Sequence, residues 1–185
     1  MTNLVVFLGP PGAGKGTQAL RISSEFNLAH ISTGDMLREH VKELTDLGKI
    51  AKSLLDEGKL VPDDLVIQML TERLSHEDCL GGSILDGFPR TLRQAESLEE
   101  ISNKFPVKKV IVLEADQEEL TKRILSRGQT SGRSDDTGDS IRVRLEVYKK
   151  DTEPLIKFYE DKGILTKING VGNVDDIYEL ISKEF

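Results

Sequence analysis

Gly9-Pro10-Pro11-Gly12-Ala13-Gly14-Lys15-Gly16-Thr17 lies between an apolar run that begins at Leu4 and a helical pattern that ends at Phe26. A continuous apolar run that ends in glycines is typical of a buried parallel strand. A glycine-rich stretch that follows such a strand and opens a helix has the context that phosphate-binding loops require. This segment therefore predicts a strand from 4 to 9, a phosphate-binding loop, and a helix from 14 to 26.

The chemistry of this loop suits a nucleoside triphosphate. Glycines allow the backbone to curl so that successive N–H groups point at phosphate oxygens, and the first turn of the helix adds partial positive charge. Lys15 can reach the β- and γ-phosphates as a point charge. Gly16 stands where many such loops have Ser or Thr, which leaves hydroxyl ligation of Mg²⁺ open. The residues expected to bind the triphosphate are Gly12, Ala13, Gly14, Lys15, Gly16 and Thr17.

Short apolar runs alternate with longer helical patterns along the rest of the chain. We expect further strands at 29–31, 83–85, 109–113 and 164–168, and helices at 33–44, 47–57, 62–74, 92–103, 117–127, 140–150 and 174–185. Strands separated by helices form a parallel sheet that is covered on both faces, so the predicted fold class is α/β with five parallel strands.

Three local signals refine this layout. Thr33-Gly34-Asp35 can cap the helix that follows. The segment 128–138 is rich in Gly, Ser, Thr and Asp, which is typical of a loop. Pro154 is expected to restart or kink the helix that begins near Ser140.

Length and composition predict one ordinary globular domain, 1–185. Charged residues make up 31% of the 185 residues, and the formal net charge of −7 argues against binding to nucleic acid or to an anionic membrane. No stretch approaches the ~20 apolar residues that a membrane span requires. The single cysteine, Cys79, can form neither an internal disulfide nor a cysteine-based zinc site. The N-terminus shows no basic region or cleavage site, so we expect a cytoplasmic protein.

Arginine is concentrated in one short segment of this acidic chain, which indicates recognition of an anion there. The alternative is a solvated helix face with salt bridges, and for Arg142 that is the preferred interpretation. The arginines of the segment are Arg123, Arg127, Arg133, Arg142 and Arg144.

Several further motifs occur in a characteristic order. They are Ile31-Ser32-Thr33-Gly34-Asp35-Met36-Leu37-Arg38, Gly58-Lys59-Leu60-Val61-Pro62, Leu85-Asp86-Gly87-Phe88-Pro89-Arg90, Arg133-Ser134-Asp135-Asp136 and Arg142-Val143-Arg144. Together they closely resemble the adenylate kinase family over essentially the whole chain, including Gly172-Asn173-Val174-Asp175. The Asp-Gly-Phe-Pro-Arg segment is highly specific to nucleoside monophosphate kinases.

The resemblance implies a P-loop NTPase-like fold with a helical NMP-binding insertion at about 32–61 and a short lid at about 128–138. It implies transfer of the terminal phosphoryl group of MgATP to AMP, giving two ADP, by a monomer without zinc. Asp86 would hold Mg²⁺ through water, and Arg127 and Gly172 would join the loop in binding ATP. The implied catalytic residues are Lys15, Arg90, Arg123, Arg133 and Arg144. The implied AMP-binding residues are Thr33, Arg38, Lys59, Leu60, Val61, Gly87, Phe88, Pro89, Arg90, Gln94, Arg133 and Arg144.

Elementary chemistry supports the same interpretation. A phosphoryl group in transfer spreads negative charge over its oxygens, so that catalysis consists mainly of positioning and charge stabilisation. Two nucleotides that face each other bring many negative charges together, which several arginines can hold and one lysine cannot. A lid that closes over the site keeps water from taking the phosphoryl group.

Other interpretations compete with each assignment. The strand, the glycine spacing, the lysine, the hydroxyl and the helix could match a phosphate-binding loop only by chance, and the glycine-rich turn would then bind nothing. A UMP/CMP kinase shares the fold, but Thr33 and the sequence after Arg90 favour AMP. A regulatory GTPase would need an acid where Pro106 stands, and a nucleotide-sensing module would not need to retain the arginines. A helical glutamine is usually exposed, so Gln94 could instead be only a surface residue. Asp135 and Asp136 could solvate the lid or, when it shuts, pair with arginines.

Overall fold

The computed structural model describes residues 3–101, 106–131, 133 and 135–185. Its centre is one five-stranded sheet in the order β2-β3-β1-β4-β5, and every neighbouring pair is parallel. The predicted α/β class and strand number are therefore confirmed. The strands are β1 (Leu4–Leu8), β2 (Ala29–Ser32), β3 (Ser83–Asp86), β4 (Val107–Glu114) and β5 (Leu165–Asn169).

Strand β1 lies in the middle of the sheet, and all five of its residues are buried. Successive side chains of a strand point to opposite faces. Leu4, Val6 and Leu8 accordingly belong to one hydrophobic cluster, and Val5 and Phe7 belong to the other. A strand that is buried on both faces needs the unbroken apolar run that precedes Gly9.

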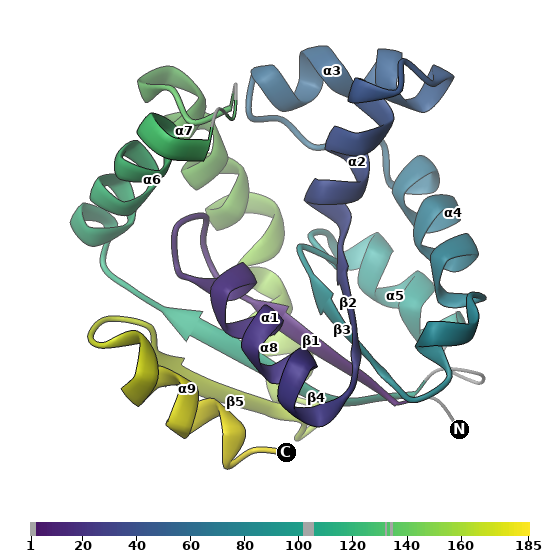
Figure 1. Cartoon of the computed structure of the whole chain (residues 1–185), viewed down its shortest axis with the longest axis vertical. Helices are drawn as coiled ribbons and strands as arrows, with labels where there is room; N and C mark the ends of the chain where they lie inside the picture. Colours follow the sequence, from purple (N-terminus) through teal and green to yellow (C-terminus); the bar gives the residue numbers. More distant parts are fainter. Residues whose placement is uncertain (1–2, 102–105, 132, 134) are drawn as a thin grey trace.

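Helices cover both faces of the sheet (Figure 1). The first cluster contains side chains of α2, α3, α4, α5 and α8, whereas the second contains those of α1, α6, α7 and α9. Among the described residues, no helix is both long and apolar enough to cross a membrane. The helices are α1 (Lys15–Phe26), α2 (Thr33–Lys42), α3 (Asp46–Asp56), α4 (Asp63–Leu74), η1 (Glu77–Cys79), α5 (Leu92–Ile101), α6 (Gln117–Ser131), α7 (Gly138–Val147), η2 (Tyr148–Thr152), α8 (Pro154–Glu160) and α9 (Val174–Ser182).

Two local predictions are wrong: one concerns the end of a helix and the other concerns a helix cap. Helix α6 continues to Ser131, so the predicted loop from 128 is helical at its start. The polar residues 129–131 are exposed on this last turn, and Gly128 allows close approach of Asp136, to whose carbonyl oxygen a Cβ at Gly128 would lie 2.9 Å away. Helix α2 is capped by Ser32, whose side chain accepts a hydrogen bond from the backbone of Asp35, and not by Thr33.

The restart expected at Pro154 is confirmed. A π-helical turn, η2, ends at Thr152, one residue before α8, and Pro154 is the first residue of α8. Because proline has no N–H, it is tolerated in the first turn of a helix. The end of the helix predicted at 92–103 lies outside the described residues, as does most of the segment 103–106, in which a regulatory GTPase would need an acid at Pro106.

At Gly48, α3 lies directly against the end of α2. A Cβ at Gly48 would lie 1.9 Å from the carbonyl oxygen of His40. Gly48→Ala is therefore expected to lower the free energy of unfolding by about 3 kcal/mol, because two helices must move apart. Denaturation in urea measures this loss. Gly138→Ala is the matched control, since nothing lies within 4 Å of its Cβ, and equal stability of the two variants would contradict the expectation.

Candidate active site

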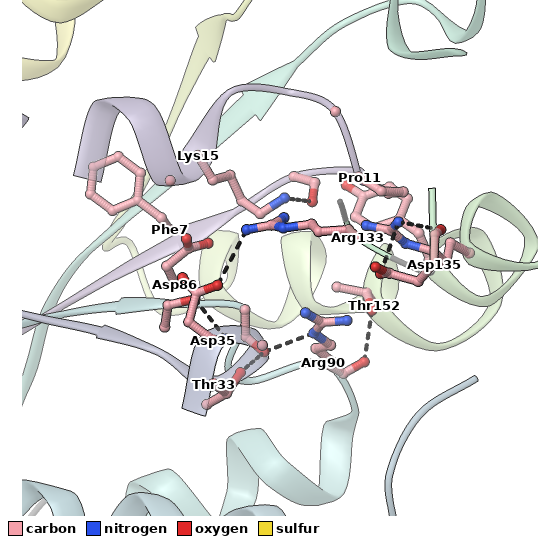
Figure 2. Close-up of a pocket in the computed structure, with 18 of the residues that line it drawn as sticks. Phe7, Pro11, Lys15, Thr33, Asp35, Asp86, Arg90, Arg133, Asp135 and Thr152 are labelled. Atoms are coloured by element: carbon pink, nitrogen blue, oxygen red, sulfur yellow. Dashed lines mark hydrogen bonds and ion pairs between the residues drawn. The ribbon is translucent and has the colours of Figure 1, made fainter. Parts of the chain in front are cut away.

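One cavity of about 760 Å³ lies at the carboxyl end of the strands. Ligands of open parallel sheets bind at this edge. The same cavity is lined by the phosphate-loop segment, the N-terminal part of α2, the segments 58–61 and 86–90, and side chains of α6 and α7. Figure 2 shows Lys15, Arg90 and Arg133 directed into this space from different parts of the chain. The sequence motifs that are far apart in the chain thus meet around one cavity.

The phosphate-loop segment has the backbone that its glycines predict. Gly12 and Gly14 have φ values of 87° and 93°, which most side chains disfavour. Helix α1 begins directly after Gly14, which caps it without a side-chain hydrogen bond, so backbone N–H groups at the helix start remain for an anion. Lys15 Nζ donates to the carbonyl oxygens of Gly9, at 2.7 Å, and Pro10, at 2.9 Å. The ammonium group is therefore held against its own loop.

Burial lowers the pKa of Lys15 to about 8. Asp86 opposes this shift, whereas the nearby guanidinium groups of Arg90, Arg144 and Arg127 add to it. An anionic ligand beside Lys15 would restore the protonated form, because opposite charge favours it.

The affinity for ATP is therefore expected to fall as the pH rises through about 8. Phosphates bind the protonated lysine, so binding takes up a proton wherever Lys15 is neutral beforehand, and the Kd rises on the order of tenfold between about pH 7.5 and about pH 9. Titration calorimetry in buffers of different ionisation enthalpy measures both quantities. Lys15→Arg is the control, because arginine stays charged across this range. A Kd that is independent of pH in the unmodified chain would contradict the assignment.

Asp86 ends β3 and lies close to the phosphate loop. A Cβ at Gly16 would lie 3.2 Å from Asp86 Oδ2, so the glycine leaves room for the carboxylate where other loops carry a hydroxyl. Burial raises the pKa of Asp86, but His30 and Lys15 outweigh this and keep it below the ordinary value. His30 Nε2 lies 3.6 Å from Asp86 Oδ2. Asp86 is therefore an ionised, partly enclosed carboxylate beside the triphosphate position.

This arrangement fits Mg²⁺. The ion usually keeps several waters and takes only one or two carboxylates together with substrate phosphates. Among the described residues, no group of three or more His, Cys, Asp and Glu side chains is placed to hold a metal by itself.

Thr33 and Arg90 converge on one backbone carbonyl. Thr33 Oγ1 and Arg90 Nε each donate to the carbonyl oxygen of Gly87 at 2.8 Å. Thr152 Oγ1 in turn donates to the carbonyl oxygen of Arg90 at 2.8 Å. Burial, with repulsion from Arg144, lowers the pKa of Arg90. The guanidinium is thus fixed in position while lacking full charge compensation, which suits an anionic ligand.

The arginines of α6 and α7 that line the cavity are paired with carboxylates. Asp136 accepts hydrogen bonds from Arg127 Nη2 at 2.6 Å and from Arg144 Nη1 at 2.8 Å. Burial raises the pKa of Asp136, but these two arginines lower it below the ordinary value. Arg123 donates to Glu119 at 2.7 Å and to the carbonyl oxygen of Gly170 at 2.8 Å. Both acids for which the sequence left two interpretations open, Asp135 and Asp136, are thus paired with arginines.

Two contacts join the segment around α2 and α3 to Arg133 and to α7. Arg133 Nη2 lies 3.2 Å from Asp35 Oδ1, and Asp35 also pairs with Arg38. A Cβ at Gly58 would lie 2.7 Å from the carbonyl oxygen of Ser140. Figure 1 shows these two groups of helices at the same end of the molecule. The cavity is therefore enclosed from both sides.

Most of the predicted residues line this cavity, but three described ones do not. Phe88 is fully buried in the first hydrophobic cluster and only its neighbours face the cavity. Ala13 is also buried, and Gly172, two residues beyond Gly170, does not belong to the lining. The predicted residues on the lining are Gly12, Gly14, Lys15, Gly16, Thr17, Thr33, Arg38, Lys59, Leu60, Val61, Asp86, Gly87, Pro89, Arg90, Gln94, Arg123, Arg127, Arg133 and Arg144.

The lining also includes polar residues to which the sequence gave no role in the site, among them His30, Asp35 and Thr152. His30 is on β2 two positions before its end, and this strand neighbours β3, where Asp86 stands. The proximity of strand ends could have indicated His30. Nothing in the sequence around Thr152 marks its contact with Arg90.

Comparison with known proteins agrees with this geometry. The family model described as "Adenylate kinase" matches residues 7–164. The chain is 48% identical over 183 residues to the adenylate kinase of Kocuria rhizophila, covering 98% of this chain and 97% of that protein. It is 45% identical over 179 residues to that of Thermus thermophilus, covering 96% and 94%. Since these matches span both the phosphate loop and the motifs across the cavity from it, the chain belongs to the adenylate kinase family.

Proposed function

We propose that this chain transfers the terminal phosphoryl group of MgATP to AMP and forms two ADP. The observation that carries the proposal is that one and the same cavity is lined by the phosphate loop and by the Gly87–Arg90 segment. Membership of the adenylate kinase family supports the same reaction. No observation favours the UMP/CMP kinase alternative.

The donor side is assigned to the phosphate loop. The backbone N–H groups after Gly12 and the start of α1 bind the triphosphate oxygens, and Lys15 neutralises charge on them. Arg123 and Arg127, on α6, line the same side of the cavity. Their present carboxylate partners, Glu119 and Asp136, would share them with the phosphates.

The acceptor side is assigned to the segments that face the loop across the cavity. Arg38 and Arg90 bind the AMP phosphate, which is already ionised and needs no general base. Thr33 and the backbone of 59–61 bind the adenosine, and Gln94 contacts the base. Gln94 is only 2% exposed and carries an amide into the lining, which supports a role in recognition over that of a surface residue.

The transfer step depends on position and charge. Lys15, Arg90 and the lid arginines surround the group in transfer and stabilise the charge on its oxygens. Closure of Arg133 and Arg144 over the cavity excludes water, so that the AMP phosphate and not water is the acceptor. The pairing of Arg133 with Asp35 supports such closure.

Asp86 would hold Mg²⁺ through water. When the ion is bound together with ATP, it neutralises part of the negative charge on the phosphate oxygens. We also propose one kinase domain with an insertion at about 32–61 and a short lid at about 128–138. We further propose that the chain is a monomer in the cytoplasm, which the family resemblance and the composition of the chain support.

An acceptor panel tests the proposed function. Purified chain is incubated with MgATP and with AMP, CMP, UMP or GMP, and the nucleoside diphosphates are separated by chromatography. AMP is expected to be the preferred acceptor. Preference for CMP or UMP would establish the alternative kinase, and no turnover with any acceptor would favour a nucleotide-sensing module.

A further inference from the structure

The amide of Gln94 is held by two neighbours that differ in chemistry. Gln94 Oε1 accepts a hydrogen bond from the backbone N–H of Arg90 at 2.7 Å, and Gln94 Nε2 donates to Asp63 Oδ1 at 2.7 Å. A backbone N–H can only donate and an ionised carboxylate can only accept. The two neighbours therefore fix which end of the amide is oxygen and which is nitrogen.

Asp63 is itself fixed by the start of α5. Its second oxygen, Oδ2, accepts a hydrogen bond from Thr91 Oγ1 at 2.9 Å, and Thr91 Oγ1 accepts from the backbone N–H of Gln94 at 3.2 Å. Thr91 and Gln94 have the spacing of a capping box, in which the glutamine reaches back to the start of the helix. The carboxylate of Asp63, on the first turn of α4, thus joins two helices and the amide in one network.

The fixed amide has a consequence for the base that it meets. An amide with these two bonds keeps one N–H and one oxygen lone pair for a further partner. Adenine offers an amino group and a ring-nitrogen acceptor at adjacent positions, whereas a 6-oxo purine offers an oxygen and an N–H, the reverse pattern. If the amide were inverted, it would prefer the 6-oxo purine over adenine. Inversion is disfavoured, because it would place the amide N–H groups against the N–H of Arg90 and the amide oxygen against the carboxylate of Asp63.

We propose that Asp63 is a positioning residue that makes the acceptor site selective for 6-amino over 6-oxo purines by fixing the orientation of Gln94. The inference rests on the proposed function, since it assumes that Gln94 meets the acceptor base. Asp63 acts through Gln94 and touches no substrate.

The test compares kcat/KM for AMP and for IMP with saturating MgATP. Asp63→Ala is expected to lower kcat/KM for AMP about tenfold, mainly by raising the KM for AMP. The kcat/KM for IMP should stay the same or rise, and the KM for ATP should not change. Asp63→Asn is expected to restore most of the selectivity, since its oxygen can face Gln94 while its NH₂ faces the hydroxyl of Thr91. In a Gln94→Ala background, Asp63→Ala should cause no further loss.

Asp64→Ala is the matched control. Asp64 is the next residue of the same helix and also bridges to α5, through Arg93 at 2.5 Å, but both side chains are exposed. The ratio of kcat/KM for AMP to kcat/KM for IMP should be the same in Asp64→Ala as in the unmodified chain. An unchanged ratio in Asp63→Ala would overturn the inference, as would an equal loss for AMP and IMP. If Asp63→Ala does not fold, Asp63→Ser carries the same comparison. Failure of the unmodified chain to phosphorylate AMP would instead refute the proposed function.

Discussion

Replacement of Lys15 by methionine is expected to reduce phosphoryl transfer from ATP to AMP by about a thousandfold. Methionine retains the length of the side chain but removes the charge that stabilises the triphosphate oxygens. The fold should tolerate the change to within about 1 kcal/mol, because the loss of two hydrogen bonds to loop carbonyls is offset by removal of a buried charge. Steady-state kinetics and urea denaturation on the same preparation measure the two effects.

Lys49→Met is the control for this experiment. Lys49 is exposed and pairs only with Asp46 on the same turn of α3 among the contacts described, so both turnover and stability should match the unmodified chain. Turnover of Lys15→Met near the unmodified rate would refute the assignment of the phosphate loop. A large loss of stability would show instead that Lys15 mainly supports the loop.

Replacement of Arg90 by alanine is expected to lower kcat/KM for AMP by about a hundredfold or more. The guanidinium is held on the carbonyl of Gly87, and burial together with repulsion from Arg144 lowers its pKa. A buried guanidinium that other arginines repel is stabilised only when an anion is bound beside it. Removal of the Arg90 side chain should therefore not destabilise the chain in the absence of nucleotides. Kinetics with varied AMP, and thermal unfolding with and without AMP, measure these effects.

Arg93→Ala supplies the control. Arg93 is three residues further along and 65% exposed, and its ion pair with Asp64 lies at the surface. Such exposed pairs contribute little to stability. Equal kinetic losses in Arg90→Ala and Arg93→Ala would show that the segment matters only through its general charge.

The centre of the fold could be predicted because local signals and tertiary structure agree there. The run from Leu4 to Gly9 is apolar throughout, as a strand buried on both faces must be, and the glycines that follow permit only a few backbones. At the end of α6, the local sequence signals and the tertiary structure disagree. The residues after Arg127 have the composition of a loop, yet packing of Gly128 against Asp136 extends the helix by another turn.

The same distinction applies to the site. Lys15, Asp86 and Arg90 come together because neighbouring parallel strands end at one edge, which the sequence predicts. The orientation of Phe88 toward the core and the hydrogen bond from Gln94 to Asp63 depend on how distant helices pack. Sequence spacing carries no information about these contacts, since Asp63 and Gln94 are 31 residues apart.

Phosphorus NMR of one reaction mixture tests the central claim most directly. The purified chain is mixed with equal amounts of MgATP and AMP, and the resonances of ATP, AMP, ADP and inorganic phosphate are followed together. ATP and AMP are expected to disappear at the same rate, two ADP should form for each AMP consumed, and inorganic phosphate should stay at its starting level. Release of inorganic phosphate while AMP remains constant would contradict the claim, because water would then be the acceptor.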